Sequence, residues 1–259
     1  MSITTVARRQ LDEEGFVILD GFMDPGLLAA LRARTAELFE EEGEQAGSEF
    51  KQETGSRRLA NLVNKGDVFR QLICEPKLLP YVTHVLKDAI KLSSLNARSA
   101  NPKNAVKQPL HADMGATLDQ RGYWVCNTVW MLDNFTAKNG AIRVIPGSHR
   151  LGKLPQDVLD DLEAKHPDEV LLTGQAGTVA VLNAHVWHGG LPNQTQRPRT
   201  AIHVFYVRRD KPQQQYQKQL LDREVQRALT GPQREMLALD DSFNDEISSK
   251  PTIRSGFLK

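Results

Sequence analysis

Residues 178–207 read TVAVLNAHVWHGGLPNQTQRPRTAIHVFYV, and this stretch decides the fold class. It opens with the apolar run Thr178–Leu182 and closes with the β-branched and aromatic run Thr200–Val207, and both runs are typical of strands. The segment between them is rich in Gly, Pro, Asn and Gln, which favour turns. The stretch therefore predicts two strands joined by a loop.

More strand-like runs precede this stretch, and each is bounded by turn residues. They are Lys91–Ser99, Trp124–Leu132, Ala141–Ile145 and Glu169–Thr173. The regular strand, helix, strand alternation of a parallel α/β protein is missing from this part of the sequence, so we expect a mostly antiparallel sandwich or barrel.

Helical patterns come mainly before the strands. The clearest covers 24–42, where Asp24 can cap the first turn, Pro25 takes the first helical position and leucines recur near helical spacing. Shorter helices are predicted at 4–14 and 76–88, with a strand at 15–19. The fold class that follows is α+β, mainly β, with helices that buttress the sheets.

The remaining segments are polar. Residues 43–58 are rich in Gly, Glu, Gln and Ser and predict a loop, while two helices are predicted in the polar C-terminal part, at 213–229 and 232–239. We expect one domain over 1–259, divided into a helical part (about 1–90), a β core (about 91–207) and a polar helical part (about 208–259).

Composition excludes several classes of protein. Lys plus Arg number 33 and Asp plus Glu 32, so there is no strong positive field for nucleic acid or for an anionic membrane. The N-terminus lacks an apolar signal core and no run of eighteen apolar residues occurs, which predicts a cytoplasmic protein. Cys74 and Cys126 lack the close-spaced partners of a disulfide scaffold or a structural zinc site.

The first candidate for chemistry is the pair His111 and Asp113 in the run QPLHAD at 108–113. Two positions apart on an extended backbone, the imidazole and the carboxylate point to the same face and can bind one metal ion. A third ligand can come from His185 or His188, which follow the strand 178–182. Two histidines and one carboxylate leave open positions on an octahedral ion, as in non-haem iron(II) oxygenases.

Open positions suit a 2-oxo acid, which can chelate the metal and leave one position for dioxygen. The far carboxylate of such a cosubstrate needs a cation. Arg199 lies eleven residues after His188, on a strand that can return toward the metal, and its planar guanidinium matches a carboxylate.

With these residues in place, the sequence resembles the phytanoyl-CoA dioxygenase family of iron(II)- and 2-oxoglutarate-dependent oxygenases, which are double-stranded β-helix (jelly-roll, cupin-like) proteins. The matching pieces are LDEEGFVILDGFMD at 11–24, the His111 and Asp113 pair, NGAIRVIPGSHR at 139–150, and the run HGGLPN at 188–193 that continues to Arg199. The resemblance implies that His188 is the distal iron ligand, that Arg199 binds 2-oxoglutarate, and that the chain uses O2.

The resemblance also suggests further cosubstrate contacts. Gln108 matches a polar position that some relatives use near the metal, Asn96 is a companion on the preceding strand, and Thr128 is predicted to assist Arg199. Some family members place a serine where this chain has Gly190, which removes one hydroxyl. Because the metal carboxylate Asp113 is intact, the resemblance implies hydroxylation or another oxidation of a C–H bond in a small molecule rather than halogenation.

Two other classes stay open at this point: a non-catalytic metal-binding β-barrel, and a cupin-type metal hydrolase or isomerase. Only the oxygenase needs Arg199 for an oxo acid. Among the remaining residues, Trp130 is the best candidate for a substrate pocket, although strand aromatics are more often core. Arg98 and Arg143 could recognise an anionic substrate, but surface salt bridges are the preferred interpretation.

Overall fold

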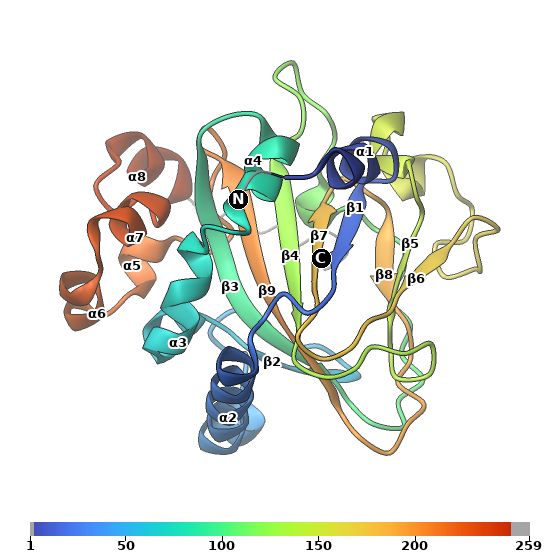
Figure 1. Ribbon diagram of the computed structural model, residues 1–259, viewed down its shortest axis with the longest axis horizontal. Helices are drawn as coiled ribbons and strands as arrows, with labels where there is room; N and C mark the ends of the chain where they lie inside the picture. Colours follow the sequence, from blue (N-terminus) through green and yellow to red (C-terminus); the bar gives the residue numbers. More distant parts are fainter. Residues whose placement is uncertain (1–2, 250–259) are drawn as a thin grey trace.

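Two antiparallel sheets form the body of the molecule in the computed structural model, which describes residues 3–249 (Figure 1). The large sheet has the order β1-β7-β4-β9-β3-β2 and consists of β1 (Phe16–Leu19), β2 (Ser56–Leu59), β3 (Ile90–Ala100), β4 (Val125–Met131), β7 (Val179–Asn183) and β9 (Arg199–Arg208). The small sheet has the order β6-β5-β8 and consists of β5 (Ile142–Val144), β6 (Val170–Leu172) and β8 (His188–Gly190).

Helices lie outside these sheets, mostly against the large one (Figure 1). The N-terminal group consists of α1 (Thr5–Glu13), α2 (Pro25–Glu42), α3 (Asp67–Arg70) and α4 (Leu79–Leu86). The C-terminal group consists of α5 (Gln217–Leu220), α6 (Arg223–Ala228), α7 (Gly231–Met236) and α8 (Ser242–Ser248). The predicted fold class is confirmed in its architecture, an antiparallel jelly roll buttressed by helices, but the structure is mixed α and β rather than mainly β.

Side-chain alternation on β4 and β9 divides the interior into two layers. On β4, Trp130 belongs to the core between the large sheet and the helices, whereas Val129 packs between the two sheets. On β9, Ile202 and Tyr206 face the helices in the same way, and Ala201 faces the small sheet. A strand buried on both faces can therefore supply packing on one side and chemistry on the other.

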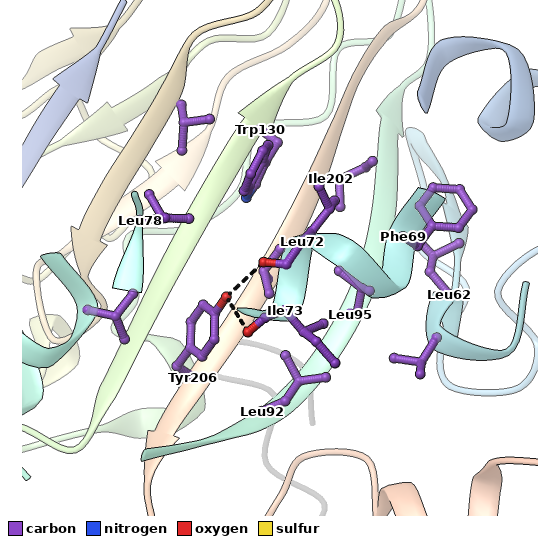
Figure 2. Packing of buried hydrophobic residues seen from close by; sticks show 14 of the residues in the cluster. Leu62, Phe69, Leu72, Ile73, Leu78, Leu92, Leu95, Trp130, Ile202 and Tyr206 are labelled. Carbon is purple, nitrogen blue, oxygen red and sulfur yellow. Dashed lines mark hydrogen bonds between the residues drawn. The ribbon is translucent and has the colours of Figure 1, made fainter. Parts of the chain in front are cut away.

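The layer under the helices is a hydrophobic core (Figure 2). The Tyr206 hydroxyl is its most prominent polar group, and it donates toward the carbonyl oxygens of Leu72 and Ile73, at 3.2 and 3.3 Å. Trp130 packs edge-on against Phe22, with ring centroids 5.5 Å apart. Trp130 is therefore a core residue, as strand aromatics more often are, and it does not line a substrate pocket.

Several element boundaries differ from those predicted, for local reasons. The expected loop 43–58 ends in strand β2, which pairs with β3 as the edge of the large sheet. β8 was not predicted as a strand, because its three residues are too few to show an alternation of apolar and polar side chains. The helix expected at 213–229 is two short helices, because Leu221 is extended and Asp222 starts α6. Asp24 does cap α2, accepting from Leu27 N at 2.9 Å.

Within residues 3–249, no helix combines the length and the apolar character that a membrane span requires.

Tyr206→Phe tests the bridge between β9 and the helical layer. The variant keeps the ring but leaves two buried carbonyl groups with one donor fewer, so we expect a loss of about 1–2 kcal/mol in the free energy of unfolding. Urea denaturation measures this loss. Tyr216→Phe is the control, because its hydroxyl bonds Asp245 in a half-buried setting. An effect at Tyr206 no larger than at Tyr216 would contradict the assignment.

Candidate metal centre

A cavity of about 70 Å³ lies between the two sheets. Residues from β2, β3, β4, β5, β7, β8 and β9 line it together with the segment that leads to β4. The lining residues are Arg58, Arg98, Gln108, His111, Asp113, Asn127, Val129, Ile142, Leu182, His188, Arg199, His203 and Phe205. The cavity therefore joins polar groups on one side to apolar strand residues on the other.

Backbone pairing places His111 beside His188. His111 N donates to His188 O at 2.9 Å, and His188 N donates to His111 O at 3.0 Å, so the two residues form an antiparallel bridge. Residues directly opposite across such a bridge project their side chains to the same face. The two imidazole rings consequently lie together, with centroids 4.4 Å apart.

Asp113 completes a group of three ligands. Its backbone N donates to Ala184 O at 2.9 Å, which attaches the segment to the end of β7. The carboxylate oxygens then lie 3.9 Å from His111 Nε2 and 3.5 Å from His188 Nε2. One donor atom from each residue falls within 4.8 Å of the others, and all three residues are buried. Two imidazoles and a carboxylate buried together in this way are typical of a metal site.

Hydrogen bonds orient both imidazoles for metal binding. His111 Nδ1 lies 2.9 Å from Pro109 O, and His188 Nδ1 lies 2.9 Å from Val186 O. A carbonyl can only accept, so Nδ1 carries the proton in each ring and the lone pair is at Nε2, which faces the carboxylate.

Burial and mutual charge set the protonation of the group. Burial, reinforced by the neighbouring His188, lowers the pKa of His111 to about 3. Burial acts in the same direction on His188, but the Asp113 carboxylate outweighs it and raises the pKa of His188. Burial also opposes ionisation of Asp113, yet the two histidines lower its pKa overall. The carboxylate is thus ionised near neutral pH, as a metal ligand must be.

His185, the other candidate ligand, lies elsewhere. Its Nδ1 is 2.9 Å from Asn183 Oδ1, and its ring packs against Tyr123 and Trp124, with centroids 5.1 and 5.7 Å away. It does not line the cavity. The structure brings His188, not His185, together with His111 and Asp113.

Arg199, the first residue of β9, lines the same cavity. It is 4% exposed, its guanidinium carbon lies 4.1 Å from the centroid of the Phe135 ring, and one terminal nitrogen donates to Gly140 O. Its Nε has no hydrogen-bond partner among the described residues. Burial, together with the positive charge of Arg98, lowers the pKa of Arg199. A buried cation in this state gains from an anionic ligand.

The other three predicted cosubstrate contacts lie in different places. Gln108 lines the cavity, and its side-chain oxygen accepts from Gly190 N at 2.8 Å. Asn96 is buried opposite His203, and neither atom of its amide has a hydrogen-bond partner in residues 3–249. Thr128 is not brought to the cavity: it faces the helical layer, donates to Val204 O at 3.3 Å and accepts from Trp130 Nε1 at 3.0 Å.

Some lining residues were missed by the sequence analysis. Asn127 Nδ2 lies 3.4 Å from both Asp113 Oδ2 and His203 Nδ1, so it helps to orient the metal carboxylate. Asn127 and His203 are polar residues inside otherwise apolar strands, on the faces that alternate with Thr128 and Val204. Once the inward face of each strand is known, this alternation identifies them.

Arg98 and Arg143 are not surface residues, so the prediction of surface salt bridges is wrong for both. The Arg143 side chain is fully buried and donates to the carbonyl oxygens of Leu162 and Ala164, at 2.7 and 2.6 Å. It holds the 160s loop against β5. Arg98 lines the cavity and forms an ion pair with Glu53.

The donor set fits a metal ion with open positions. Two imidazole nitrogens and one carboxylate oxygen come from one side, and the cavity continues past them to Arg199. A site of this kind, with two histidines and one carboxylate, is the arrangement of non-haem iron(II) oxygenases, whereas a closed zinc site needs a fourth protein ligand. The fold and this set of candidate ligands are therefore those of the non-haem iron(II) oxygenase class.

Comparison with known proteins gives the family. The family model of phytanoyl-CoA dioxygenase (PhyH) matches residues 11–201, and the chain belongs to this family. It is accordingly an oxidoreductase of the dioxygenase class. The resemblance stated from the sequence is confirmed.

Individual relatives are distant but share the architecture. The chain is 26% identical over 208 residues to the dioxygenase aneA of Aspergillus aculeatus, covering 72% of this chain and 66% of aneA. The structure of HygX from Streptomyces hygroscopicus with nickel and 2-oxoglutarate bound is similar, with a TM-score of 0.69, 16% identity, and coverage of 83% and 91%. EctD from S. alaskensis with bound Fe has a TM-score of 0.67, 20% identity, and coverage of 80% and 77%.

His188→Ala and His185→Ala form a matched test of the ligand assignment. Removing His188 takes away one of three ligands, so we expect the affinity for iron(II) to fall on the order of a hundredfold or more. Removing His185 should leave it within a few fold. Anaerobic equilibrium dialysis with metal analysis measures both. A larger loss at His185 than at His188 would refute the assignment.

Proposed function

We propose that this chain is an iron(II)- and 2-oxoglutarate-dependent dioxygenase that oxidises a C–H bond of a small organic substrate, with release of succinate and CO2. The observation that supports it most is a single cavity that contains both the ligand triad and a buried arginine. The similar structures of HygX with 2-oxoglutarate and EctD with Fe agree with this proposal.

Each residue has a defined task in the proposal. His111, Asp113 and His188 hold the iron, and Arg199 pairs with the far carboxylate of 2-oxoglutarate. Gln108 and the partnerless amide of Asn96 supply neutral hydrogen bonds nearer to the metal. When bound, iron(II) with the oxo acid supplies activation of O2. The protein holds the cosubstrate in one orientation and excludes bulk water from the cavity.

The side chains that line the cavity support these proposed roles. Val129, Ile142 and Leu182 are apolar lining residues, and they suit the methylene carbons of an extended five-carbon diacid. Arg199 gains an anion that offsets its burial. Asn127 donates toward Asp113 and holds the carboxylate in position.

The type of oxidation follows from Asp113. The carboxylate occupies the ligand position that a halide would need, so the proposed outcome is hydroxylation or another reaction begun by hydrogen abstraction. We further propose that residues 1–259 act as one catalytic domain, because elements from residue 58 to residue 205 contribute to one cavity.

A metal-binding barrel without catalysis, or a cupin-type hydrolase, would not require a buried guanidinium beside the open positions. Arg199 and its partnerless Nε therefore favour the oxygenase over both alternatives.

Anaerobic titration of iron(II) and 2-oxoglutarate tests the proposed function. We expect a weak visible metal-to-ligand charge-transfer band that is lost in His111→Ala. In Arg199→Ala the band should need at least about tenfold more 2-oxoglutarate, because one charge-assisted pair is removed, while iron binding persists. Arg197→Ala is the control, since that arginine is exposed two positions earlier. No band in folded, iron-loaded protein would favour the binding-protein or cupin-type alternatives.

A further inference from the structure

We propose that Arg58 and Arg98 form a receptor for an anionic group, a carboxylate, on the primary substrate. This inference rests on the proposed function and deepens it, because it names the class of substrate that the cavity accepts. The proposed anion-binding site consists of the two arginines and of Glu53, which forms an ion pair with each of them.

The two guanidiniums are placed together by strand register. Arg58 on β2 and Arg98 on β3 are directly opposite each other in the antiparallel pair. Like charges in that relation destabilise a sheet unless an anion lies between them. The repulsion between Arg58 and Arg98 therefore has to be offset by an anion that binds both of them.

Glu53 supplies part of the compensation. Its carboxylate lies 2.7 Å from a terminal nitrogen of Arg98 and forms a second ion pair with Arg58. Only 5% of the Glu53 side chain is exposed, against 12% for Arg58 and 19% for Arg98. One carboxylate therefore serves two cations, and both cations retain some accessible surface.

That accessible surface faces the reaction site. Arg58 and Arg98 both line the cavity that contains His111, Asp113 and His188. Arg98 also lines the smaller adjoining cavity beneath residues 54–56, and its Nε bonds Ser56 Oγ at 3.3 Å. The pair is thus attached to the wall of the active site rather than to the outer surface.

The balance of charges around the cavity indicates that the arginines lack one anionic partner. Iron(II) and 2-oxoglutarate carry opposite charges of equal size, so together they leave the balance unchanged. With neutral histidines, three guanidiniums (Arg58, Arg98 and Arg199) then face two carboxylates (Glu53 and Asp113). One positive charge remains in a largely buried site, where an unpaired charge is costly.

A carboxylate on the substrate would balance this charge and match the planar donor geometry of arginine. A substrate with a cationic group at the same place would be repelled. The cosubstrate does not fill this role in the proposal, because its two ends are already assigned to the metal and to Arg199.

Butyrate and butyramide are the probes, since they differ in charge but little in shape. Each is added anaerobically to the protein loaded with iron(II) and 2-oxoglutarate, and broadening of the probe's NMR signals by the paramagnetic iron reports binding near the metal. We expect butyrate to bind at least about tenfold more tightly than butyramide, and Arg98→Gln to remove that preference while the charge-transfer band of 2-oxoglutarate is kept.

Glu53→Gln gives a test of opposite sign. It removes the internal competitor but keeps both arginines, so we expect butyrate to bind several-fold more tightly. This variant also carries the test if Arg98→Gln does not fold. Arg57→Gln is the control: Arg57 is the adjacent residue on β2, but it is exposed and its guanidinium lies 4.3 Å from the Phe39 ring, on the other face of the strand.

The outcomes separate the two levels of the proposal. Equal binding of butyrate and butyramide beside a normal charge-transfer band would overturn the inference and leave the dioxygenase assignment intact. A loss of 2-oxoglutarate affinity in Arg98→Gln would also overturn it, because the arginine would then serve the cosubstrate. Absence of the band in the unchanged protein would contradict the proposed function itself.

Discussion

The two hydrogen bonds between His111 and His188 are the constraint on which the site depends. They join a segment that has no regular strand structure of its own to β8, and they fix the two imidazoles on one face. Asp113 follows two positions later and is attached separately to the end of β7. The positions of the three proposed metal ligands are therefore set by backbone pairing and do not rely on the packing of flexible side chains.

The large sheet gives this pairing its surroundings. Its central strands are buried on both faces, and alternation sends Trp130, Ile202 and Tyr206 into the helical layer while Asn127, Val129 and His203 face the cavity. The helices consequently support the site from behind without contributing to it. This separation explains why the face toward the helices is mainly apolar, whereas the face toward the cavity carries buried amides and imidazoles.

Much of this could be predicted from the sequence, because the strands have clear composition and the motif residues are few. The fold class, α2 with its Asp24 cap, and most strands follow from local patterns. The grouping of His111, Asp113 and His188 also agrees with the structure, although the choice against His185 depended on family resemblance. Thr128 shows the limit of such prediction: the sequence suggested that it assists Arg199, but the face that it occupies depends on a register that only the folded sheet defines. Arg98 and Arg143 show a second limit. A single charged residue in a strand gives the same sequence pattern whether its side chain ends in solvent or in a buried ion pair.

The edge position of β2 has a consequence for how the protein can change. β2 is four residues long, pairs with β3 alone, and is preceded by the segment that carries Glu53. Within residues 3–249, β2 shares no backbone hydrogen bonds with β8 or with the segment 108–113, which carry the proposed metal ligands. A short insertion or exchange in residues 51–59 can therefore alter what enters the cavity without disturbing the metal centre. In evolutionary terms, the proposed substrate-binding residues and the proposed metal ligands lie on separable pieces of one chain, so new preferences can arise at little cost to the chemistry.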